Sequence, residues 1–247
     1  MEPLAHEGMG RLLGLQDRCT PLVLGADAGA KLLPVSELGN GGALKLGRRK
    51  LELPPQPLGR DTTQAPFLAV SNEIAVVDGA ASHNPRKLVE MLAIARKEAG
   101  WQRLLYAPAV EPAEMPLLAY LGGDLFDSLT AELRSVAGFR LEQGDWIPDG
   151  EATIAGNLKA LAIWLARIRT ALEQGLLREL VERTALHNPR VTQLLHHSRD
   201  LLVTRGVRRA TEIRAGALSF DHPAVVEWRR RLERFAPPAE GMVLLLL

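Results

Sequence analysis

Residues 120–128 read Tyr-Leu-Gly-Gly-Asp-Leu-Phe-Asp-Ser and decide the fold class of this chain of 247 residues. They place two carboxylates, Asp124 and Asp127, three residues apart after an apolar run and a glycine pair. Just upstream, residues 103–110 (Arg-Leu-Leu-Tyr-Ala-Pro-Ala-Val) have the pattern of a short buried strand. A strand, a loop, a short helix and a strand ending in acids is how α/β barrels present catalytic carboxylates. The alternative is that both aspartates only cap or end an element, because aspartate is common there.

The part of the chain before this stretch predicts further strands and a helix. Residues 67–70 and 74–77 have the apolar composition of buried strands, and residues 21–24 form a plausible shorter one. Asn84 is expected to cap a helix that starts with a proline, and Gly100 is expected to end it. This alternation of strands and helices is typical of parallel βα units.

After Pro148 the sequence pattern becomes helical. Asn157 is predicted to cap a helix with one apolar face, and Gly175 is predicted to end it. Three further helices are expected over residues 176–186, 189–203 and from 221–223 to 235.

Composition excludes several classes of protein. The chain is 47% hydrophobic, which supports a sizeable core, and 24% charged, which argues against a membrane protein. The net charge is only +1, so nucleic-acid binding would need local basic patches. Cys19 is the only cysteine, so we expect neither an internal disulfide nor a thiolate metal cluster. The N-terminus has no secretory pattern and the apolar run 242–247 is too short for a bilayer. A cytoplasmic protein without membrane partners is the expectation.

Four stretches, in order, resemble the tRNA-guanine transglycosylase superfamily, most closely the N-terminal, transglycosylase-like part of its archaeosine synthase branch. The resemblance covers most of residues 78–247. The stretches are residues 84–92, residues 104–110 with 115–128, residues 157–158 with 176–182, and residues 222–231 with 237–238 and 243–247.

The resemblance implies a catalytic role for Asp127. In the transglycosylases, the matching aspartate attacks the anomeric carbon of the target nucleotide and forms a covalent glycosyl-enzyme intermediate. Asp124 and Ser128 would then support the site, and Asp78 is the nearest candidate for the second aspartate, an acid/base. The alternative is that Asp127 serves structure alone. No cofactor is implied, and no metal, because the superfamily's zinc site needs three cysteines and this chain has one.

The resemblance also implies partners, namely tRNA and a deazaguanine base. Residues 199–235 hold nine arginines against five acidic residues, a net charge of +4 that suits phosphate. The alternative is that these arginines only lie on solvent-exposed faces of helices, without a binding role. Three tryptophans, at 146, 164 and 228, are predicted to pack against other parts of the protein rather than to bind a ligand. The candidate tRNA contacts are Arg205, Arg208, Arg209, Arg214, Arg229 and Arg230.

These inferences predict an α/β fold with a shortened or degenerate TIM-type (β/α) barrel over residues 1–148. This part is followed by an all-helical module over 149–236. Residues 237–247 are then expected to begin a strand of a further domain. In archaeosine synthases a Pro-Cys motif and Lys-Pro-Tyr come after the matching strand, and this chain stops before them. Three explanations are open: a split gene with a separately encoded synthase C-terminal domain, a fragment, or loss of that domain. The predicted function is tRNA modification in the 7-deazaguanine pathway. A non-catalytic tRNA-binding subunit or fragment is one alternative, and a DNA-directed relative is another.

Overall fold

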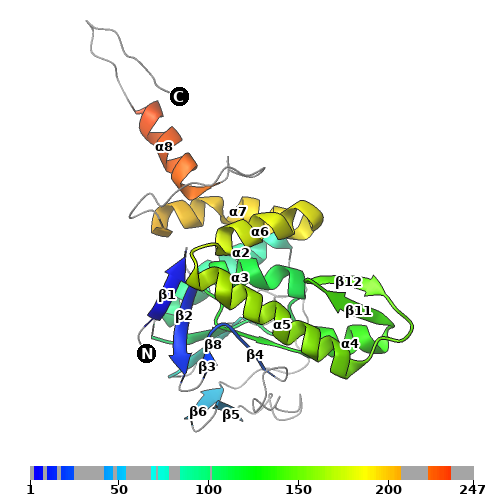
Figure 1. Ribbon diagram of the computed structural model, residues 1–247. Helices are drawn as coiled ribbons and strands as arrows, with labels where there is room; N and C mark the ends of the chain where they lie inside the picture. The colour runs from blue at the N-terminus through cyan, green and yellow to red at the C-terminus, as the bar shows by residue number, and fades with distance from the viewer. Residues whose placement is uncertain are drawn as a thin grey trace, which may run out of the picture.

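The computed structural model describes most of the chain as a mixed α/β structure (Figure 1). At its centre, the described residues form a five-stranded sheet in the order β4-β10-β9-β8-β7. The described residues are 3–7, 10–15, 18–24, 42–46, 49–53, 68–70, 72–77, 84–100, 102–206 and 222–234. The central strands are β4 (Leu22–Leu24), β7 (Leu68–Val70), β8 (Ile74–Val77), β9 (Leu104–Tyr106) and β10 (Leu125–Asp127).

The central sheet confirms the predicted parallel βα arrangement. Strands β8, β9, β10 and β4 run parallel, and only β7, at one edge, is antiparallel to its neighbour. The two edges, β4 and β7, do not meet in the part of the chain that the structure describes, so the sheet is open there. A closed TIM-type barrel therefore stays a prediction, as does the division into domains.

The remaining elements surround this sheet. Helix α6 packs on α3, and α7 packs on both α2 and α6. The helices are α2 (Pro85–Ala99), the 3-10 turn η1 (Pro112–Glu114), α3 (Met115–Tyr120), α4 (Leu129–Val136), α5 (Ile154–Glu173), α6 (Leu177–His187), α7 (Pro189–Gly206) and α8 (Pro223–Glu233). The outer strands are β1 (Pro3–Glu7), β2 (Gly10–Leu15), β3 (Arg18–Cys19), β5 (Gly42–Leu46), β6 (Arg49–Leu53), β11 (Phe139–Glu142) and β12 (Asp145–Pro148).

Helix α2 begins and ends where the sequence predicts. The Asn84 side chain accepts a 2.8 Å hydrogen bond from the backbone N–H of Lys87, which satisfies a donor of the first turn. Gly100 adopts a φ of 62° at the other end, a conformation that costs glycine little. Leu88 and Leu92, one turn apart, are fully buried and bring the helix onto the sheet.

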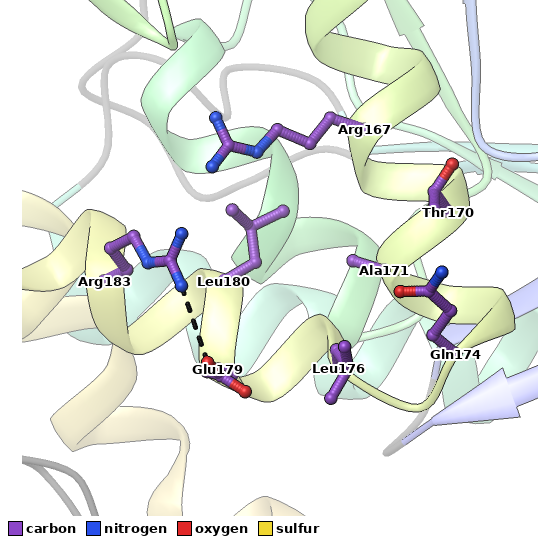
Figure 2. Close-up of a pocket in the computed structure, with 8 residues that line it drawn as sticks. All are labelled: Arg167, Thr170, Ala171, Gln174, Leu176, Glu179, Leu180 and Arg183. Carbon is purple, nitrogen blue, oxygen red and sulfur yellow. Dashed lines mark hydrogen bonds and ion pairs between the residues drawn. The ribbon is translucent and has the colours of Figure 1, made fainter.

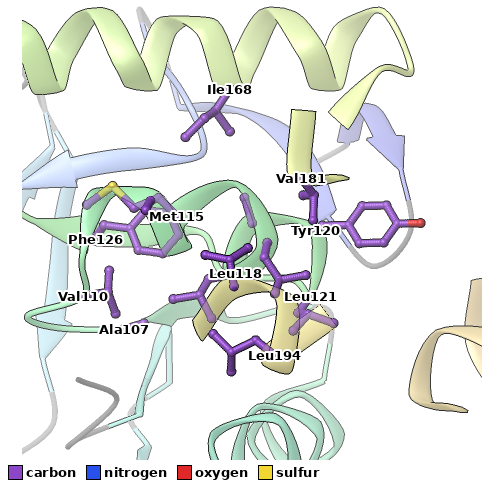
Figure 3. Close-up of a cluster of buried hydrophobic side chains, with 14 of the residues drawn as sticks. Ala107, Val110, Met115, Leu118, Tyr120, Leu121, Phe126, Ile168, Val181 and Leu194 are labelled. Atoms are coloured by element: carbon purple, nitrogen blue, oxygen red, sulfur yellow. The ribbon is translucent and has the colours of Figure 1, made fainter. Parts of the chain in front are cut away.

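One continuous hydrophobic core joins the sheet to the helices (Figure 3). Phe126 of β10 is fully buried and lies in the same cluster as Leu118 of α3. Ile168 of α5, Val181 of α6 and Leu194 of α7 belong to this cluster as well. The helices after Pro148 therefore bury their apolar faces against the same core as the strands.

Strands β11 and β12 form a hairpin that the sequence analysis did not predict. Its two-residue turn, Gln143-Gly144, has φ angles of 51° and 99°, as a type I′ turn requires. A Cβ atom on Gly144 would lie 2.9 Å from a ring carbon of Trp164, so only glycine fits. The alternation of Phe139 and Leu141 ahead of the turn was the available signal.

The prediction that Asn157 caps a helix is wrong. Helix α5 begins one turn earlier, and Thr153 caps it by accepting a 3.1 Å hydrogen bond from the N–H of Gly156. Asn157 is buried instead against the outer edge of β11. Its side chain accepts from the N–H of Leu141 at 2.8 Å and donates to the C=O of Phe139 at 2.7 Å. The amide thus forms the hydrogen bonds with the backbone of β11 that a neighbouring strand would otherwise form.

Asn157→Ala is expected to lower the free energy of unfolding by about 1–3 kcal/mol, because a buried N–H and C=O lose their partner. Urea unfolding measures this, with the exposed Glu173→Ala on the same helix as control. Hydrogen exchange at the Leu141 amide is expected to accelerate. Unchanged protection of that amide would show that the side chain does not close the edge of β11.

Candidate functional site

The two aspartates of residues 120–128 lie at opposite ends of strand β10 and have different surroundings. Asp124 comes just before the strand, and Asp127 is its last residue, at the carboxyl edge of the parallel sheet. Ligands of open α/β sheets bind at this edge. Asp127 therefore lies at the edge where such sheets bind ligands, whereas Asp124 lies toward the other end of the strand.

Asp124 is fully buried and held by two arginines. Arg11 of β2 donates from Nε and Nη2 to its two carboxylate oxygens, both at 2.9 Å. Arg96 of α2 donates to Oδ2 at 2.9 Å, and the backbone N–H of Leu105 donates to the same oxygen at 2.9 Å. The Asp124 carboxylate thus links the start of β10 to β2, α2 and β9 through ion pairs and hydrogen bonds.

The same arginines also bind loop carbonyls. Arg96 donates to the carbonyl oxygens of Gly100 at 3.0 Å and Arg103 at 3.2 Å, and to that of Gly122. Arg11 donates to the carbonyl of Arg103 at 2.7 Å. Sequence analysis missed this network; its one signal was Arg96 next to the buried Ala95 on the apolar face of α2.

Asp127 is only 3% exposed, and both of its carboxylate oxygens accept hydrogen bonds. Oδ2 accepts from the hydroxyl of Tyr106 at 2.9 Å and the N–H of Ala109 at 2.8 Å. Oδ1 accepts from the N–H of Leu129 at 3.0 Å. Burial raises the pKa of this carboxyl above its ordinary value, and the three hydrogen bonds oppose that rise.

The loop after β9 supplies one of these donors in an unusual conformation. Ala109 has a φ of 52°, in the left-handed region that side chains other than glycine rarely adopt. Residues held in such conformations cluster at functional sites. Because the carboxylate is buried, an oxygen of Asp127 would first have to become accessible before it could attack a sugar carbon.

Ser128, another predicted member of the site, has a hydrogen-bond partner other than the Asp127 carboxylate. Ser128 is fully buried, and its hydroxyl donates to Glu132 at 2.6 Å. Asp78 lies outside the described residues. Its neighbour Val77 ends β8, two strands from β10, so these two strand ends are roughly 10 Å apart at ~4.8 Å per strand.

Two further carboxylates, Glu111 and Glu114, connect the segment after β9 to other elements, and sequence analysis missed both of them. Glu111 accepts from Arg134 at 2.9 Å and from the indole N–H of Trp146 at 2.6 Å. Glu114 is buried and pairs with Arg190 of α7, and its burial raises the pKa of the carboxyl. Their spacing in Glu-Pro-Ala-Glu, directly after the strand pattern, was the available signal.

The predicted tRNA contacts are only partly within the described residues. Arg229 is exposed and Arg230 half-buried, both on α8. Trp228 beside them is 55% exposed, so its predicted packing role is wrong in this structure, whereas Trp164 is buried as predicted. The side chain of Arg205, on α7, and the whole of Arg208, Arg209 and Arg214 lie outside the described residues.

The described residues contain neither a cluster of metal ligands nor a helix that could span a membrane. No three His, Cys, Asp or Glu side chains of the described residues come together as a metal site. None of the described helices combines the length and the apolar character that a bilayer crossing requires.

The fold and site define an α/β protein with a buried carboxylate at each end of one central parallel strand. No known family profile matches the chain. It is 27% identical to archaeosine synthase of Methanocaldococcus jannaschii over 164 residues, 65% of this chain and 29% of that protein. It is 31% identical to archaeosine synthase subunit alpha of Thermococcus kodakarensis over 142 residues, 56% of this chain and 25% of that protein. The chain is thus related to archaeosine synthases and spans less than a third of either relative.

Proposed function

We propose that this chain acts in archaeosine modification of tRNA as a non-catalytic subunit that binds tRNA for a separately encoded catalytic domain. The relation to two archaeosine synthases supports the pathway. The Thermococcus relative is itself named a subunit, which supports a division of labour between chains.

One observation carries the non-catalytic role: the Asp127 carboxylate is buried, with only 3% of the residue exposed. A nucleophile must present an unshielded oxygen to the sugar, roughly 3–3.5 Å from the carbon that it attacks. Burial also raises the pKa of Asp127, which disfavours the ionised form that would attack. Asp127 in this arrangement stabilises the loop after β9 and the start of α4.

A second candidate function is base exchange by a transglycosylase-type enzyme, with Asp127 as nucleophile and Asp78 as acid/base. The position of Asp127 at the carboxyl edge of the parallel sheet favours it. Its substrates would be tRNA and a deazaguanine base. This candidate also requires membership of the transglycosylase superfamily, a barrel that closes, and a rearrangement that exposes one oxygen of Asp127.

Trapping on tRNA distinguishes the two candidates. Wild type and Asp127→Asn would be incubated with tRNA bearing guanine or 7-cyano-7-deazaguanine, then examined by gel shift and denaturing gel. We expect both proteins to bind tRNA and neither to form a covalent adduct. Circular dichroism would confirm that the variant is folded, and Ser128→Ala serves as a neighbouring control.

An adduct formed by wild type and lost in Asp127→Asn would establish the second candidate and refute the non-catalytic role. Failure of both folded proteins to bind tRNA would refute both candidates.

A further inference from the structure

Helices α5 and α6 enclose a groove on the surface of the protein. One hollow of about 170 Å³ lies between them (Figure 2) and a second of about 130 Å³ continues toward the β11–β12 hairpin. The two hollows share Arg167, Leu180 and Arg183, so they form a single groove. We call it the α5–α6 groove.

Two arginines line both hollows of the α5–α6 groove. Arg167 extends from α5 over the hollow toward α6, and Arg183 lies on α6 beside Leu180 (Figure 2). The Arg167 guanidinium is positioned by a 3.2 Å hydrogen bond to Gln143 and by the ring of Trp164, 5.6 Å away. Restraint by a hydrogen bond and an aromatic face reduces the entropy that an arginine loses when it binds a ligand.

The shape and chemistry of the groove suit an extended anion. Helix α6 has 11 residues, so the groove beside it runs for about 16 Å, enough for several successive phosphates of one strand. Arginine forks match phosphate geometry. The side chains of Thr170 and Gln174 add uncharged groups that can hydrogen-bond phosphate or ribose.

We propose that the α5–α6 groove binds the sugar-phosphate backbone of tRNA through Arg167 and Arg183. This inference rests on the proposed function, since it gives the tRNA-binding subunit a binding surface. The surface is separate from Arg229 and Arg230 of α8. The contact reads phosphate and backbone shape rather than base sequence.

The acidic residues of the groove provide a second test of the proposal. Glu179 is half-exposed and pairs with Arg183 at 3.4 Å, and Asp145 lies at the hairpin end. An exposed ion pair of this kind is weak, so a phosphate can replace the carboxylate. Glu179→Gln removes the competing charge and is therefore expected to strengthen tRNA binding.

The decisive measurement is the tRNA affinity of the full chain as a function of salt. The double variant Arg167→Ala/Arg183→Ala is expected to bind tRNA at least 10-fold more weakly than wild type. The magnitude of the slope of log affinity against log salt is expected to fall by about 1.4–1.8. The reason is that the variant has lost two phosphate contacts and therefore releases fewer counterions from the tRNA. The matched control is Arg86→Ala/Lys87→Ala, which removes two charges from an exposed face of α2. We expect the control to change affinity less than 2-fold.

The outcomes separate this inference from the proposed function. If wild type binds tRNA and the groove variant weakens binding no more than the control, the inference is overturned and the proposed function stands. A weaker affinity with an unchanged salt slope overturns it as well, since no phosphate contact was lost. If folded wild type binds no tRNA, the inference and the proposed function fail together.

Discussion

Asp124→Asn is expected to lower the free energy of unfolding by about 3–5 kcal/mol, the usual effect of removing one partner from a buried ion pair. Arg11 and Arg96 are both buried and share this carboxylate. An asparagine has one acceptor oxygen and no charge, so it cannot compensate either guanidinium. Urea unfolding at neutral pH measures the change through the midpoint and the slope of the transition.

The control for this prediction is an exposed pair. Arg86 and Glu90 of α2 are 3.0 Å apart and mostly exposed, so Glu90→Gln is expected to change stability by about 0–1 kcal/mol. If Asp124→Asn changed the unfolding midpoint no more than Glu90→Gln, the buried pair would not be holding β2 and α2 against the sheet.

Asp127→Ala is expected to cost about 2–5 kcal/mol, because three donors lose their acceptor at once. Two of them are the backbone N–H groups of Ala109 and Leu129, and the third is the Tyr106 hydroxyl. The control is Ser128→Ala, which removes one hydrogen bond to Glu132. We expect Ser128→Ala to cost less, about 0.5–1.5 kcal/mol.

The contribution of Asp127 also depends on pH, with a defined sign. Its folded pKa is raised above 3.8 by burial, so the folded state holds this proton more tightly than the unfolded state. The added stability is fully present below about pH 3.8 and is lost as the pH rises through the raised pKa. The stability difference between wild type and Asp127→Ala is therefore expected to narrow as the pH rises. A difference that widened with pH would mean that the hydrogen bonds outweigh burial.

Local signals made much of the fold predictable. The cap at Asn84 and the glycine at Gly100 act within one helical turn, so the bounds of α2 follow from sequence alone. The apolar runs at residues 74–77 and 104–106 gave the parallel strands for the same reason. A closed barrel depends instead on pairing between distant strands, which local patterns do not specify.

The candidate site was predictable in position but not in its contacts. Asp127 was placed correctly at a strand end, whereas its donors include the backbone N–H groups of two loop residues, which have no side-chain signature. Arg11, which binds Asp124, is 113 residues away in sequence. Asn157 was assigned as a cap because its side chain suits that role, and only the folded chain brings it to β11.

The outer edge of β11, occupied by the Asn157 amide, has a consequence for how the protein behaves at high concentration. A two-stranded ribbon has two open edges on which another chain can add a strand and start aggregation. Here one edge is blocked by a side chain, and the strand on the other side ends in Pro148, which has no N–H to donate. We therefore expect the hairpin to resist pairing with a second copy of itself, although it lies at one side of the molecule (Figure 1).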